Sequence, residues 1–279
     1  MNTAITRRSL LLAPLAAPLV RAQASKCRIG ITDWNLRLTV KPESIPLAAK
    51  LGFDGVQISC GRRIVDGKMP LDDPALIAQM KALSKQHNIP IDGTCVDRLH
   101  DDGLKSEKAA VGWVRDAIRL TQAVGTQVLL LPFFGKWALD TQAEKDYTGD
   151  ALRDLGPEAE KAGVILGLEN TISAEDNVRI MERSRSKAVL VYYDVGNSTN
   201  RGFDILKEIR WLGKDRICQM HLKDNPNYLG EGKIQFPSVM QAIRDIGFAG
   251  YANLETDAKS PATLEADQRR NLEYLRKLA

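Results

Sequence analysis

The stretch VILGLENT, residues 164–171, is a run of aliphatic residues that ends in a carboxylate. Four of its first five residues are large and aliphatic, which is typical of a strand covered on both faces. A charged side chain costs free energy when it is buried alone. Glu169 therefore needs a partner, and that partner must come from another part of the chain.

Short apolar runs like this one alternate with amphipathic segments from residue 28 onward. No Pro/Gly/Ser-rich linker interrupts the alternation, which favours a single domain. The predicted strands are 28–32, 55–59, 90–94, 127–131, 164–168, 189–193, 216–221 and 251–254, and the predicted helices include 73–88, 106–124, 141–162, 203–212, 237–246 and 261–278.

Eight strand–helix repeats in one chain predict an α/β fold of the (β/α)₈ (TIM) barrel type, spanning residues 25–279. Glycines at positions 52, 125, 163 and 247 lie where helices are expected to end. An open doubly wound sheet is the alternative, but it usually has fewer repeats and often a glycine-rich loop after the first strand. Here the first strand is followed by DWNL.

The first 24 residues predict an export signal. Arg7 and Arg8 precede an apolar run, Leu10–Val20, and an A-x-A cleavage pattern ends at Ala24. The arginine pair resembles a twin-arginine signal, which exports proteins already folded. The run is about half of what a spanning helix needs, so we expect a periplasmic or secreted protein without stable membrane insertion.

Charge and cysteine content exclude other classes of protein. The net charge of +4 falls to +1 without the signal, because that segment holds three arginines and no acids. No Lys/Arg-rich run is present, so we expect no nucleic-acid partner. Four scattered cysteines predict buried thiols rather than a disulfide-built fold. A bridge between Cys60 and Cys95 stays open, as does the oligomeric state.

Four predicted strands in succession end in a metal-binding type of residue. These are Glu169, Asp194, His221 and Glu255, spaced by 25, 27 and 34 residues, or about one repeat each. In a barrel these strand ends converge on one rim, where three carboxylates without a cation repel one another. One nitrogen and three oxygen ligands suit one divalent ion, either Mn²⁺, Mg²⁺, Co²⁺ or Zn²⁺.

The motifs GLEN, YYDVGN, HLKD followed by LGEGKIQF, and NLETD resemble the sugar phosphate isomerase/epimerase superfamily. These are xylose isomerase-like TIM barrels that include D-tagatose 3-epimerase and inosose enzymes. The resemblance implies that the four positions hold one divalent metal and that Glu169 and Glu255 are the catalytic acid/base pair. The implied activity is isomerisation or epimerisation of a sugar, keto-sugar or cyclitol through a metal-stabilised enediolate.

Five residues near the strand ends are predicted to bind this small carbohydrate substrate: Trp34, Asn35, His100, Asn197 and Lys223. An indole stacks on sugar faces, and amides bind hydroxyl groups. Asn197 departs from the DxxH pattern of ketose epimerases, where a histidine touches the substrate. An amide cannot exchange protons at neutral pH, so specificity like that of D-tagatose 3-epimerase is not expected.

Three other functions compete with an epimerase. A lyase acting on an inosose or 3-keto-glycoside uses the same enolate chemistry when a leaving group is present. A non-enzymatic sugar-binding protein needs no acid/base pair. The apurinic endonucleases of this fold require a histidine-rich site with three zinc ions, and the whole chain has only three histidines.

Overall fold

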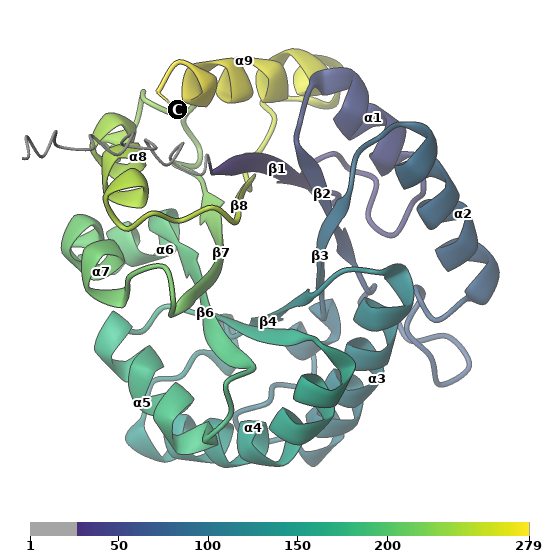
Figure 1. Cartoon of the computed structure of the whole chain (residues 1–279), viewed down its shortest axis with the longest axis vertical. Helices are drawn as coiled ribbons and strands as arrows, with labels where there is room; N and C mark the ends of the chain where they lie inside the picture. Colours follow the sequence, from purple (N-terminus) through teal and green to yellow (C-terminus); the bar gives the residue numbers. More distant parts are fainter. Residues whose placement is uncertain (1–26, 279) are drawn as a thin grey trace, which may run out of the picture.

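The computed structural model of the protein describes residues 27–278 and confirms the predicted barrel. Eight parallel strands form one closed sheet in sequence order, and helices surround it (Figure 1). No strand boundary differs from its predicted position by more than one residue. The strands are β1 (Arg28–Thr32), β2 (Gly55–Ser59), β3 (Ile91–Cys95), β4 (Val128–Pro132), β5 (Ile165–Glu169), β6 (Val189–Asp194), β7 (Ile217–Leu222) and β8 (Tyr251–Leu254).

The helices form the outer layer of the barrel. They are α1 (Ser44–Leu51), α2 (Pro74–Gln86), α3 (Lys108–Val124), α4 (Gln142–Ala162), α5 (Ala174–Ser184), α6 (Val195–Asn200), α7 (Ile205–Leu212), α8 (Phe236–Asp245) and α9 (Leu264–Arg276). Three short 3₁₀ helices lie in the connections: η1 (Asp97–His100), η2 (Gly135–Trp137) and η3 (Pro261–Thr263).

Local sequence explains where several helices begin and end. Gly52, Gly125 and Gly163 follow α1, α3 and α4 in the left-handed conformation, with φ of 92°, 94° and 68°, which a residue without Cβ adopts most easily. Thr141 and Glu144 form a capping box that starts α4. These stops and starts keep the connections short and return the chain to the next strand.

The inside of the barrel is partly polar. Gln57, Thr94, Gln219 and Asn253 are all at least 98% buried, and hydrogen bonds across the barrel link several of these side chains. The aliphatic residues of the strands and helices form the large core between sheet and helix layer. Polar groups inside the sheet place the site on a rigid, hydrogen-bonded floor.

The structure tests the prediction about the cysteines but does not describe the predicted export signal. The four cysteines are free thiols, so Cys60 and Cys95 are buried but not bridged. The predicted signal, residues 1–24, lies outside the described residues. Among residues 27–278, no helix is long and apolar enough to cross a membrane.

Candidate metal centre and substrate pocket

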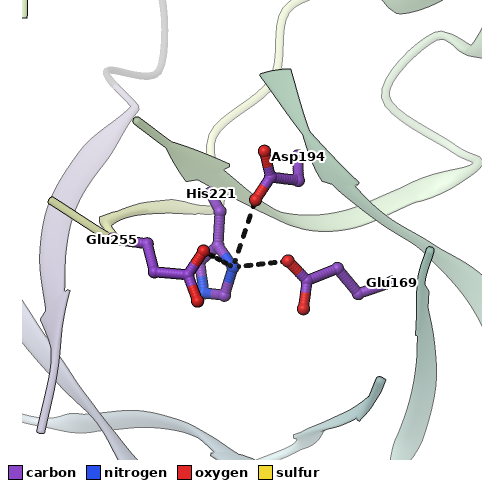
Figure 2. A group of neighbouring side chains, drawn as sticks. All are labelled: Glu169, Asp194, His221 and Glu255. Carbon is purple, nitrogen blue, oxygen red and sulfur yellow. Dashed lines mark hydrogen bonds and ion pairs between the residues drawn. The ribbon is translucent and has the colours of Figure 1, made fainter. Parts of the chain in front are cut away.

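Four strand-end side chains meet at the C-terminal rim of the barrel (Figure 2). Glu169 ends β5, Asp194 ends β6, His221 lies near the end of β7, and Glu255 directly follows β8. One ligand-type atom from each residue lies within 4.8 Å of the others. The structure thus brings together the four residues that the sequence proposes as metal ligands.

The carboxylates surround one nitrogen of His221. Its Nδ1 lies 2.9 Å from Oε1 of Glu169, 3.5 Å from Oε2 of Glu255 and 3.8 Å from Oδ2 of Asp194. Figure 2 shows the two glutamates approaching this nitrogen from opposite sides. His221 is fully buried, and Glu169 and Asp194 are nearly so.

The other nitrogen of His221 contacts the floor of the barrel. Nε2 lies 2.9 Å from Oε1 of Gln57, which also accepts a hydrogen bond from the hydroxyl of Tyr192. The amide nitrogen of Gln57 faces the carbonyl of Thr94 at 3.5 Å, which fixes the orientation of the amide. Because this oxygen only accepts hydrogen bonds, Nε2 carries a proton, and the lone pair of Nδ1 is the one that a metal would use.

Short local interactions position the carboxylates. Oδ1 of Asp194 accepts a hydrogen bond from the backbone N–H of Asn197 and so caps α6. The side chain of Asn170 exchanges hydrogen bonds with Asn177 and closes the turn after β5. Oε1 of Glu255 accepts from the indole N–H of Trp34. Each carboxylate therefore leaves β5, β6 or β8 in a defined direction.

Lys223 contributes the positive charge beside the cluster. Its Nζ lies 2.8 Å from Oδ2 of Asp194 and 2.5 Å from Oε2 of Glu255. Oδ2 of Asp194 is buried and accepts no well-aligned hydrogen bond. Three carboxylates and one ammonium leave two negative charges when the imidazole is neutral, which is the charge that one divalent ion balances.

The electrostatics of the cluster reflect this crowding. Burial, opposed by Lys223 and reinforced by the neighbouring carboxylates of Glu169 and Glu255, raises the pKa of Asp194 to about 7. Burial also acts to raise the pKa of Glu255, but the charges of His221 and Lys223 outweigh it and lower that pKa to about 2. Carboxylates of such different basicity in one site are typical of functional centres.

The donor set fits a bound divalent ion. All four donors come from rigid strand ends, His221 is oriented by Gln57, and the negative charge exceeds the positive charge of the side chains present. An imidazole nitrogen with three carboxylate oxygens and no thiolate is a ligand set for a hard or borderline cation. Glu169, Asp194, His221 and Glu255 are the residues that would hold it.

A pocket of about 530 Å³ opens above the cluster. Of the residues predicted to bind substrate, Trp34, His100, Asn197 and Lys223 line it. Asn35 lies outside the lining, because its side chain accepts a hydrogen bond from Thr32 and donates one to Asp257. The turn after β1 thus directs neighbouring side chains to different places.

The opposite wall of the pocket contains residues that are not among the predicted substrate-binding residues. Ser59 and Arg62 come from the end of β2 and the loop after it, and Asp97 begins η1 after β3. Ser59 donates a hydrogen bond to Asp97, and His100 stacks on Phe134 with 6.2 Å between ring centroids. A polar residue at the end of a predicted strand was the available signal for Ser59, whereas Asp97 lies three residues beyond the predicted strand 90–94.

Fold and site together define a (β/α)₈ barrel with a carboxylate–histidine cluster at the C-terminal ends of β5 to β8. Residues 45–278 match the family described as xylose isomerase-like TIM barrel. The chain belongs to this family.

Relatives with assigned names are epimerases. The chain is 30% identical over 205 residues to 2-epi-5-epi-valiolone 7-phosphate 2-epimerase of Actinoplanes sp., which covers 72% of this chain and 73% of that protein. It is 23% identical over 240 residues to D-psicose 3-epimerase of Enterocloster bolteae, covering 78% and 77%. These relatives support enzymatic activity for the chain.

Solved structures share the fold. D-psicose 3-epimerase from Clostridium cellulolyticum H10 has a TM-score of 0.76 at 18% identity, covering 90% of this chain and 99% of that one. For 3-keto-D-glucoside 4-epimerase from E. coli the TM-score is 0.72 at 19% identity, with coverage of 90% and 100%. At such identities the likeness concerns the architecture of the barrel.

Proposed function

We propose that the protein is a divalent-metal-dependent epimerase or isomerase of a sugar, keto-sugar or cyclitol. The observation that carries this proposal is the placement of Glu169 and Glu255 on opposite sides of the metal-ligand nitrogen of His221, beneath an open pocket. The names of the relatives support the same reaction class. In a two-base inversion, one group removes the proton on one face of the carbon and a second group returns a proton on the other face.

The residues of the chain divide the work of the reaction. One of the two carboxylates, Glu169 or Glu255, removes the proton next to a substrate carbonyl on one face, and the other returns a proton on the opposite face. Lys223 holds Asp194 and Glu255 in place and supplies positive charge near the substrate oxygens. Asn197 faces the pocket and binds a hydroxyl group. A bound divalent ion would polarise the substrate carbonyl and stabilise its developing negative charge.

Deuterium incorporation tests the proposal. The metal-loaded protein is incubated in D₂O with ketoses, inososes and 3-keto-glycosides, and C–H exchange is followed by NMR. We expect exchange with at least one sugar, reduced about 10²- to 10⁴-fold by Glu169→Gln or Glu255→Gln. Exchange with inversion identifies an epimerase, and release of a leaving group identifies a lyase. Wild-type protein that exchanges no proton in the whole panel contradicts the proposal.

Metal content is tested separately. We expect elemental analysis to find one divalent ion per chain and the variant Asp194→Asn to lose most of it. Two or three zinc ions per chain would contradict a mononuclear site.

We further propose that the protein acts outside the cytoplasm, on the basis of the N-terminal arginine pair and apolar run. A fusion of residues 1–40 to a reporter that is active only after export tests this location.

A further inference from the structure

The two halves of the pocket differ in chemistry. The cluster of Glu169, Asp194, His221 and Glu255 occupies the half formed by β5 to β8. Strands β2 and β3 lie across the barrel from β6 and β7 (Figure 1). Their ends supply the second polar wall, made of Ser59, Arg62, Asp97 and His100 and here called the β2–β3 wall. A substrate held at the cluster extends toward this wall.

Asp97 is the acceptor group of the β2–β3 wall. The hydroxyl of Ser59 donates to Oδ2 of Asp97 and itself accepts a hydrogen bond from the backbone N–H of Gly61 at 2.8 Å. This chain of hydrogen bonds holds the carboxylate at the pocket surface. Since a carboxylate has about four acceptor sites, Asp97 keeps capacity for hydroxyl groups of a ligand.

The basic side chains in the described lining are already matched by acids or are neutral. Arg62 contacts Asp101 through Nε at 3.1 Å and Nη2 at 2.6 Å, and Lys223 contacts Asp194 and Glu255. Burial lowers the pKa of His100, which keeps the imidazole neutral at pH 7. Burial raises the pKa of Asp97, and the hydrogen bond from Ser59 opposes this effect. A divalent ion together with Lys223 would balance the three carboxylates of the cluster, so ionised Asp97 is the negative charge left on the opposite wall.

We propose that the pocket takes an uncharged polyhydroxylated substrate, that Asp97 binds hydroxyl groups at the end remote from the cluster, and that phosphate esters are disfavoured. This inference rests on the proposed function and narrows its substrate class. A phosphate ester that reaches the β2–β3 wall places its charge beside Asp97, while the guanidinium in the described lining, that of Arg62, is paired with Asp101. Juxtaposed like charges and an unmatched desolvated anion both oppose binding.

Paired substrates test the inference. Deuterium exchange by the metal-loaded full chain is measured with D-fructose against D-fructose 6-phosphate and with D-ribulose against D-ribulose 5-phosphate. We expect kcat/KM for exchange to be at least about tenfold higher for the free ketose of an exchanging pair, which corresponds to about 1.4 kcal/mol. Phosphate esters that exchange as fast as or faster than the free sugars would overturn the inference.

Two variants locate the effect. Asp97→Asn keeps the shape of the side chain but removes its charge, so we expect KM for the free ketose to rise about five- to tenfold with a smaller change in kcat. Ser59→Ala removes the donor to Asp97 together with the acceptor of the Gly61 N–H, and it is expected to act in the same direction more weakly. Unchanged KM in both folded variants would overturn the role of Asp97.

A third variant makes the guanidinium of Arg62 available to a phosphate ester. Asp101→Asn releases Arg62, so we expect faster exchange with the phosphate ester and little change with the free ketose. No gain for the ester would contradict the role of the Arg62–Asp101 pair. Absence of exchange with every sugar overturns the proposed function itself, whereas exchange that favours phosphate esters overturns this inference alone.

Discussion

Gln57 shows how one buried amide prepares a metal ligand. It is fully buried inside β2, and its Oε1 lies 2.9 Å from Nε2 of His221. Hydrogen bonds of this kind fix the tautomer of a ligand histidine and typically affect metal affinity by about 10- to 100-fold. The amide therefore acts through His221 and not on the substrate.

Replacing this amide tests its positioning role. We expect Gln57→Leu to weaken Mn²⁺ binding about 10- to 100-fold, measured by calorimetry, because Nε2 of His221 loses its acceptor. Gln57→Glu restores an acceptor and should recover most of the affinity. Tyr192→Phe is the control, since it removes one other donor to the same oxygen but keeps the aromatic ring that packs against His221. Unchanged affinity in folded Gln57→Leu would refute the role.

Residues in loops were the hardest to predict. Asn35 and Trp34 are adjacent in sequence, yet only Trp34 lines the pocket, since the turn after β1 sends the Asn35 amide to Asp257. Arg62 and Asp97 follow β2 and β3 in polar segments without periodicity. Their positions depend on loop conformation, which the hydrophobic pattern does not encode.

At the scale of elements, strand β7 and the residue after it place an imidazole and an ammonium group in one site. His221 and Lys223 are two residues apart, and alternate residues along a strand point to the same side. Both reach the carboxylates of Asp194 and Glu255. Lys223 therefore competes electrostatically with a metal ion for the same negative charge.

Removing this lysine should strengthen metal binding while impairing turnover. We expect Lys223→Met to bind Mn²⁺ several-fold more tightly, because a like charge near the ion is lost, and to exchange sugar protons more slowly. Lys108→Met, at the exposed start of α3, makes the same charge change at a residue that does not line the pocket and should alter neither property. Weaker metal binding in Lys223→Met would show that the ammonium mainly organises the carboxylates.

Strands were easier to predict than helices because each strand is a buried run with a clear end. All five residues of β2, β3 and β4 are buried, so their composition reveals them. The region after β6 was less clear, since Asp194 both ends the strand and caps α6, a six-residue helix before α7. A helix this short has no hydrophobic period to detect.

For the molecule as a whole, the barrel and the metal-ligand candidates were predictable for one reason. Eight repeats of about the same length bring strand ends to one rim, so residues up to 86 positions apart in sequence, such as Glu169 and Glu255, meet there. The polar interior was not predictable, because its hydrogen bonds join residues of β2, β3, β6 and β8 across the barrel.

Asp92 makes this interior sensitive to pH. It lies inside the barrel on β3, where Oδ1 accepts a hydrogen bond from Asn253 at 3.1 Å and Oδ2 has no partner among the described residues. Gly30 and Gly55 make room for it, since a Cβ at either position would lie within 2.5 Å of Oδ2. Burial raises the pKa of Asp92 to about 7.

The raised pKa sets the direction of the pH effect on stability. A carboxyl that holds its proton more tightly when folded stabilises the fold at low pH, and this contribution is lost as pH rises from about 4 to about 7.

Asp92→Asn removes the titration and keeps the shape of the side chain. We expect its free energy of unfolding, relative to wild type, to increase by on the order of 2 kcal/mol between pH 5 and pH 8. In thermal melts with EDTA, the melting temperature of Asp92→Asn relative to wild type should therefore be about 4–8 °C higher at pH 8 than at pH 5. Asp66→Asn, at an exposed position, should show no such change between the two pH values, and an equal response of the two variants would refute the role of Asp92.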